Sequence, residues 1–217
     1  MTNHISIIDN NNEINNNTTN KWSRKIGFGL LTFFGMLVGF YGLAMPILTP
    51  IFAQGSVVHA NFLLQSQTLL YFHFIGAGIA LLISPIQFYL YKRFKTAHRI
   101  MGRIYGLSVL FGAIGALNMA QTAYGGLIST WGLSILAILW IVFTGMAIYF
   151  AIKRDIKAHK RWIIRSVALT FAALTLRVIS PFIGLVVDDM TTSQIVYWLS
   201  WIINLLLAEI WIVKKKL

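Results

Sequence analysis

Apolar residues occur in six long runs that are separated by short polar or basic segments. A helix needs roughly 20 apolar residues to cross a bilayer core about 30 Å thick, and each run is long enough to do so. The spans fall near residues 27–51, 66–91, 104–125, 131–152, 163–186 and 194–213. The remaining loops are too short for a separate soluble domain, so the pattern predicts one all-α transmembrane domain of six helices over residues 21–217.

The basic residues fix the expected orientation of these helices. Seventeen of the 18 Lys and Arg residues lie in four clusters, at residues 21–25, 92–103, 153–165 and 214–216. Short loops rich in Lys and Arg stay in the cytoplasm, so both termini are expected there. The net charge of +12 is then explained by orientation and by anionic lipid headgroups at the cytoplasmic face, which argues against nucleic acid as a partner.

Two further features of composition narrow the function. Residues 1–20 contain eight asparagines and no apolar pattern, so this tail is predicted to be disordered. The chain contains no cysteine, which excludes disulfides, iron–sulfur clusters and thiol catalysis.

Small and polar residues recur at helical spacing inside the spans. In lipid, such residues mark the faces along which helices pack, so they predict a compact bundle with a polar-lined interior. The stripes contain Gly35, Gly39 and Gly42; His73, Ala77, Ala80, Ser84 and Gln87; Ser108, Gly112 and Gly115; Ser166, Thr170, Ala173, Arg177 and Ser180; and Ser200, Asn204 and Ala208. The fourth span has the weakest stripe.

Arg177 is the one basic residue outside the four clusters. Counted from the predicted inner end of its span, it lies roughly 20 Å deep, where an unpaired guanidinium costs about 3 kcal/mol or more. Two interpretations follow. In the first, Arg177 has a structural role and hydrogen-bonds to His73, Asn118 and helix carbonyls. In the second, it binds an anionic group such as a cofactor carboxylate, a quinone oxygen or a lipid phosphate.

A basic motif occurs twice on the cytoplasmic side, with an offset of 61 residues. Ala97-His98-Arg99 corresponds to Ala158-His159-Lys160, and Arg103 and Arg165 follow the two histidines. One interpretation is a solvated interface in which imidazole acts as an amphipathic group. The other is a haem site, because neutral imidazoles ligate haem iron and neighbouring Arg side chains can pair with the propionates.

The remaining membrane-level histidines, His59 and His73, belong to the outer half of the protein. With one histidine pair near each face, the layout would suit electron transfer across the bilayer through two haems. A zinc site is less consistent with the sequence, since no Asp or Glu accompanies either pair as a further ligand. The metal-ligand candidates are therefore His73, His98 and His159, and only as ligands of haem iron.

Three runs of sequence resemble a known family. They are HFIGAGIALLISPIQF at 73–88, AHRIMGRIYGL at 97–107 and AHKRWIIRSVALTFAALTLRV at 158–178. Together they are similar to the domain-of-unknown-function 2306 family, over about residues 60–185. The resemblance implies a multi-pass protein of the bacterial inner membrane, without an established activity. The family's motif positions would be His73, Gln87, His98, Arg99, Gly102, Arg103, Tyr105, His159, Trp162, Arg165 and Arg177.

Three hypotheses for function follow. The leading one is a membrane redox protein that binds haem b or a quinone, with Gln87, Asn118 and the basic residues named above beside the histidines. The second is a non-catalytic assembly factor or lipid-binding scaffold in a membrane protein complex, because no carboxylate pair or complete ligand set is present. The third is a small anion transporter that uses Arg177 for its substrate.

Overall fold

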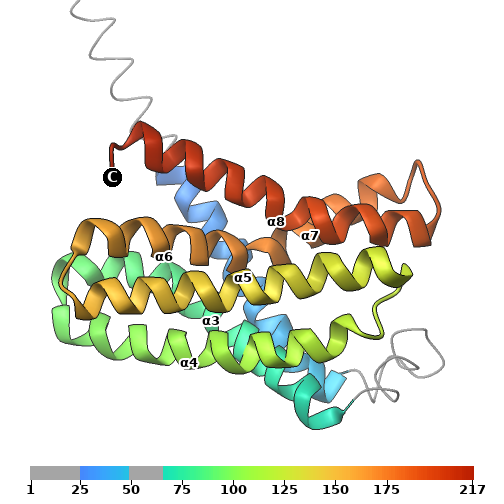
Figure 1. Ribbon diagram of the computed structural model, residues 1–217, viewed down its shortest axis with the longest axis horizontal. Helices are drawn as coiled ribbons and strands as arrows, with labels where there is room; N and C mark the ends of the chain where they lie inside the picture. Colours follow the sequence, from blue (N-terminus) through green and yellow to red (C-terminus); the bar gives the residue numbers. More distant parts are fainter. Residues whose placement is uncertain (1–24, 49–65) are drawn as a thin grey trace, which may run out of the picture. The chain divides into compact units, whose positions relative to one another are not determined.

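The computed structural model describes residues 25–48 and 66–217 of the chain, and within them it contains helices and no strand. The helices, shown in Figure 1, are Lys25–Leu48, α3 (Gln67–Arg93), α4 (Lys95–Ala120), α5 (Gly126–Ile152), α6 (Ile156–Thr170), α7 (Ala172–Ile183) and α8 (Asp189–Lys214). With α6 and α7 forming a single span, six segments are long and apolar enough to cross a membrane. The prediction of an all-α, six-span membrane protein is confirmed. The predicted disordered tail and His59 lie outside the described residues.

The chain divides into two compact units, Met1–Phe34 and Gly35–Leu217, and the packing described below belongs to the second. Within it, α3 packs most extensively against α4, while α5 lies between α4 and α6 and also contacts α8. From α3 to α8, consecutive spans run antiparallel, as expected for spans joined by short loops (Figure 1).

Two helices begin earlier than the apolar pattern predicts. α4 starts at Lys95 and α6 at Ile156, whereas the apolar runs begin near residues 104 and 163. Lys, Arg and Ala favour helix, and long basic side chains can extend toward water from the end of a span. The side chain of Asp155 caps α6 by accepting a hydrogen bond from the Ala158 backbone N–H at 2.9 Å. His98 and His159 therefore lie on helices and not in loops.

Close helix packing depends on glycines at the α3–α4 interface. A Cβ atom on Gly115 would overlap the Leu69 carbonyl oxygen and the His73 backbone nitrogen. A Cβ atom on Gly112 would lie 3.0 Å from the Ala77 nitrogen. On the first helix, a Cβ atom on Gly39 would lie 3.1 Å from the Gly78 carbonyl oxygen. These stripes of small residues allow the backbones to approach, as predicted.

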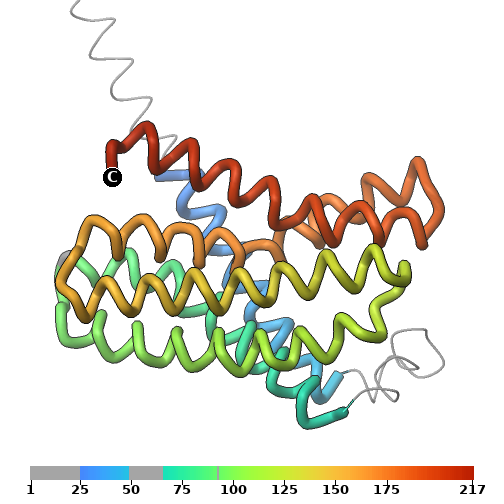
Figure 2. Tube along the Cα trace, viewed as in Figure 1, coloured from blue at the N-terminus to red at the C-terminus, as the bar shows by residue number. Residues whose placement is uncertain are grey.

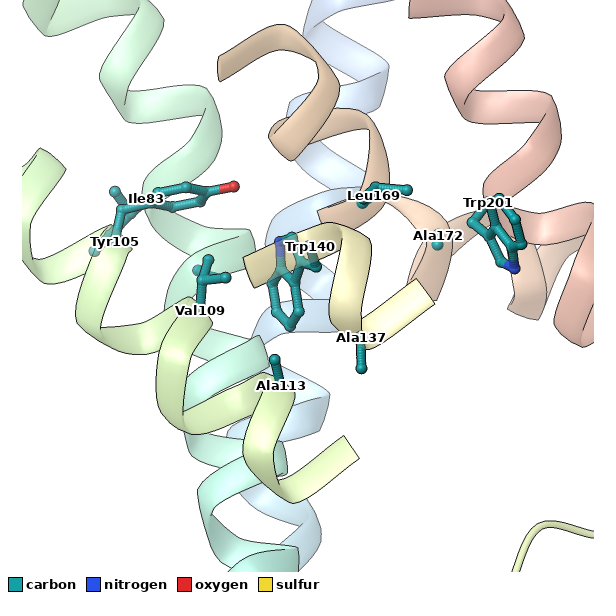
Figure 3. Packing of buried hydrophobic residues seen from close by; sticks show 10 residues of the cluster. Ile83, Tyr105, Val109, Ala113, Ala137, Trp140, Leu169, Ala172 and Trp201 are labelled. Atoms are coloured by element: carbon teal, nitrogen blue, oxygen red, sulfur yellow. The ribbon is translucent and has the colours of Figure 1, made fainter. Parts of the chain in front are cut away.

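The hydrophobic core lies where α3, α4, α5, α6 and α8 meet. Figure 3 shows Trp140 at its centre, with Val109 and Ala113 of α4 on one side and Leu169 near its other side. The span formed by α6 and α7 is interrupted at Phe171, and Figure 2 follows the chain through this point. Beside the interruption, the Asn204 side chain of α8 donates to the Ala168 carbonyl at 3.0 Å and accepts from Thr175 at 2.9 Å. The Asn204 side chain of α8 thus provides a hydrogen-bond donor for a backbone carbonyl of α6 inside the membrane span.

Candidate functional site

His98 and His159 lie at the same place in two successive helical hairpins, α3–α4 and α5–α6. In the first hairpin, Gln87 Nε2 donates to the His98 carbonyl at 3.2 Å. In the second, His159 Nδ1 lies 2.8 Å from the Ala147 carbonyl. Since a carbonyl only accepts, this Nδ1 carries a proton, and the neutral form of the imidazole has its lone pair on Nε2. His98 and His159 lie within electrostatic range of each other.

Two polar atoms beside this histidine pair have no partner among the described residues. They are Gln87 Oε1 and His98 Nδ1, and both are buried. The Tyr91 ring lies edge-on to the His98 ring at 6.0 Å, and Lys160 Nζ lies 5.2 Å from the Tyr91 ring centroid. Gln87, Tyr91, His98, His159 and Lys160 are called the inner-face cluster below. Buried polar atoms without a partner cost about 1–3 kcal/mol each, so this cluster offers unfilled hydrogen-bonding capacity.

The three arginines expected near the histidines differ in their surroundings. Arg165 donates from Nε and Nη2 to the Glu209 carboxylate at 2.5 and 2.9 Å, and its guanidinium lies 4.8 Å from the Trp162 ring. Its charge is therefore compensated within the chain by α8. Arg99 and Arg103 have exposed side chains on α4. Of the three, these two can best reach an anionic group outside the helices.

A second polar group, the hydroxyl cluster, lies about 10 Å deeper, because Tyr105 and Ser166 each follow a histidine, His98 and His159, by seven residues or about two helical turns. Tyr105 Oη lies 2.7 Å from Ser166 Oγ and 2.8 Å from Thr170 Oγ1. Trp140 Nε1 donates to Thr170 Oγ1 at 2.9 Å, and Thr144 Oγ1 lies 2.6 Å from Ser166 Oγ. These five side chains join α4, α5 and α6.

The hydrogen bonds of the hydroxyl cluster extend to the helix backbone. Thr144 reaches the Trp140 carbonyl at 2.7 Å, and Thr170 reaches the Ser166 carbonyl at 3.0 Å. All five side chains thus have partners, which is the condition for polar groups to stabilise packing in lipid. Trp140 and Thr144 are not among the candidate site residues predicted from the sequence. The sequence does show that Trp140 and Thr144 are four residues apart, and this spacing of about one helical turn puts both side chains on one face of α5.

The outer half does not form one connected site among the described residues. His73 Nδ1 donates to the Gly112 carbonyl of α4 at 2.9 Å. Asn118 Oδ1 is buried without a partner there. Arg177 Nη1 donates to the Ala173 carbonyl at 2.8 Å, and its guanidinium lies 5.4 Å from the Tyr41 ring. Arg177 thus bonds to a helix carbonyl, as one interpretation predicted, but within the described residues no hydrogen bond joins it to His73 or Asn118.

Metal-ligating residues are sparse in the described ranges, 25–48 and 66–217. These ranges hold no group of three or more His, Cys, Asp or Glu side chains that could bind a metal ion. Haem iron needs only two protein ligands. The pair His98 and His159 is therefore the arrangement relevant to a haem.

A family model described as a predicted membrane protein, DUF2306, matches residues 70–212. The chain belongs to the DUF2306 family. The match includes both hairpins, the inner-face cluster and the hydroxyl cluster. No curated protein and no solved structure matches this DUF2306 chain.

Proposed function

We propose that this DUF2306 protein is a membrane redox protein whose inner-face cluster binds a quinone or a b-type haem. The observation that carries the proposal is the pair of buried atoms without partners, Gln87 Oε1 and His98 Nδ1. They lie within a membrane-spanning hairpin, where each unsatisfied polar atom is costly. A bound group that supplies hydrogen-bond partners would remove this cost.

The donor set favours a quinone over a haem. His159 has the tautomer of a ligating imidazole, with Nδ1–H on the Ala147 carbonyl and the Nε2 lone pair free. Haem iron could use this lone pair, and Arg99 and Arg103 could meet the propionates. Iron ligation would still leave Gln87 Oε1 without a donor. A quinol hydroxyl can donate to that oxygen, and a ring oxygen or hydroxyl can also pair with His98 Nδ1.

In this proposal, the protein residues bind the ring and exchange its protons. When bound, a quinone supplies two-electron chemistry, with electrons from a separate redox partner. His98 can hold a proton on Nδ1, and the Tyr91 ring provides an apolar contact beside it. The isoprenoid tail would lie in the surrounding lipid.

Binding of decylubiquinone to the detergent-purified protein tests the proposal, with tryptophan fluorescence as the readout. Gln87→Leu and His98→Ala should each weaken binding about tenfold, which corresponds to loss of one buried hydrogen bond. Gln121→Leu is the matched control, because the Gln121 side chain is exposed at the other end of α4 and donates to the Leu117 carbonyl of its own helix.

A visible spectrum of the oxidised and dithionite-reduced protein separates the two cofactors. Sharp reduced bands that His159→Ala abolishes would assign the site to haem. Absence of both the bands and quinone binding, from cells with ample haem, would overturn the redox proposal. The non-catalytic scaffold would then be the better account, since the satisfied hydroxyl cluster suits a purely structural core.

We also propose that the protein lies in a bacterial inner membrane with both termini in the cytoplasm. The support is the clustering of Lys and Arg in the 92–103 and 153–165 segments. Because the chain has no cysteine, single cysteines can report the sidedness. A membrane-impermeant maleimide should label Val186→Cys in intact spheroplasts and label Lys157→Cys only after lysis. The reverse pattern would contradict the orientation.

A further inference from the structure

Arg177 lies closer to the outer end of its span than the apolar pattern predicts. The span extends over Ile156–Ile183, and Arg177 is six residues before its end. At 1.5 Å per residue this is about 9 Å, which brings a long side chain within reach of the headgroup level. The side chain is exposed on the surface of α7. This surface faces lipid in a membrane, as the exposed Val178 and Phe182 on the same helix also indicate.

The described residues do not neutralise the charge of Arg177. Its guanidinium uses one donor on the Ala173 carbonyl and lies over the Tyr41 ring. The ion pair found in the described ranges joins Arg165 to Glu209. Asp188, at the start of α8, accepts hydrogen bonds from Thr191 instead. An arginine within a span costs about 3 kcal/mol or more unless an anion or other acceptors satisfy it.

His73 is the polar side chain of α3 within electrostatic range of Arg177. Its Nδ1 is committed to the Gly112 carbonyl, and an imidazole carries no negative charge. His73 therefore adds polarity to this region without compensating the guanidinium. An anion that pairs with Arg177 would therefore come from outside the described residues.

We propose that Arg177, supported by the Tyr41 ring, binds the phosphate of an anionic phospholipid of the outer leaflet. Guanidinium groups pair with phosphate through two parallel N–H···O bonds, and Arg177 has donors left after its contact with Ala173. The lipid is favoured over a soluble phosphate because the guanidinium opens onto an apolar helix surface. Val178 and Phe182 offer that surface to the acyl chains. This site is independent of the inner-face cluster.

Native mass spectrometry with added phosphatidylglycerol tests this site. Arg177→Gln should lower the fraction of protein that retains the lipid about fivefold, and Arg177→Lys should retain an intermediate fraction, because lysine keeps the charge without the paired donors. Lys157→Gln is the matched control, since it removes the same charge from an exposed position near the other end of this span. Circular dichroism and gel filtration verify that the variants fold.

Each outcome decides the proposal. Equal lipid retention by the wild type and Arg177→Gln would overturn it. Displacement of the lipid by millimolar inorganic phosphate would also overturn it, in favour of a soluble anion as the ligand. If Arg177→Gln does not fold, the comparison between wild type and Arg177→Lys decides: equal retention contradicts the paired phosphate contact, and lower retention supports it.

Discussion

Tyr105 and Ser166 occupy matching positions 61 residues apart in two successive hairpins, and their side-chain oxygens lie 2.7 Å apart. A similar pair, 60 residues apart, lies on the preceding helices. Ser84 and Thr144 each donate to the carbonyl four residues earlier, both at 2.7 Å. The two hairpins therefore meet through equivalent positions, and the hydroxyl cluster lies at their interface. Repeats in membrane proteins commonly place functional residues at such an interface.

Tyr105→Phe should destabilise the protein by about 1 kcal/mol, the usual size of a side-chain hydrogen bond between membrane helices. The substitution keeps the ring packing and removes the hydroxyl that contacts Ser166 and Thr170. Unfolding in mixed micelles under increasing denaturant measures the change in the free energy of unfolding.

Tyr89→Phe is the control for this measurement, because Tyr89 is 63 % exposed on α3. It removes the same hydroxyl from a site outside the cluster, so its effect should be near zero. If both variants lose the same stability, the hydroxyl cluster does not hold the three helices together.

Gly115→Ala should destabilise the α3–α4 pair by about 1–3 kcal/mol, as overpacking does in tight interfaces. The added methyl group would meet backbone atoms of Leu69 and His73, which cannot rotate away. Gly145→Ala is the matched control, since a Cβ atom there meets nothing within 4 Å. The control should be neutral or slightly stabilising because alanine favours helix. Thermal unfolding followed by circular dichroism compares the two, and equal midpoints would contradict the close approach.

The sequence predicts the spans and the packing faces well, because both depend on local composition. Gly112 and Gly115 follow from spacing alone, since small residues at helical intervals mark a contact. The hydroxyl cluster does not follow in the same way. Thr144 lies in a mostly apolar span, and its partner Ser166 belongs to another helix, so the contact depends on how the hairpins face each other. The ion pair between Arg165 and Glu209 likewise joins residues of two different helices, α6 and α8, and depends on how these helices pack.

Asn204→Leu should destabilise the protein by about 1–2 kcal/mol, because it leaves the Ala168 carbonyl and the Thr175 hydroxyl without this partner beside the interruption at Phe171. Asn118→Leu provides the contrast. Its Oδ1 is buried without a partner in the described part of the chain, so an apolar replacement should be close to neutral or stabilising. The difference between the two free energies of unfolding tests whether Asn204 stabilises the interrupted span. A larger loss for Asn118→Leu would contradict this assignment.

Asp188 should make the start of α8 sensitive to acid. Its carboxylate accepts hydrogen bonds from the Thr191 backbone N–H at 3.0 Å and from the Thr191 hydroxyl at 2.7 Å. These bonds lower the pKa of Asp188 below its ordinary value of 3.8. A lowered folded-state pKa means that the stabilisation is complete above the unfolded-state pKa and is lost as the pH falls through the folded-state value. The difference in thermal midpoint between wild type and Asp188→Ala should therefore be constant from about pH 5 to pH 7 and shrink in stronger acid.

Asp189→Ala is the control for this measurement. It removes a neighbouring carboxylate that lies in the first turn of α8 and does not cap it, so it should lower the midpoint less. A pH-independent difference for Asp188→Ala would show that the cap does not depend on the carboxylate charge.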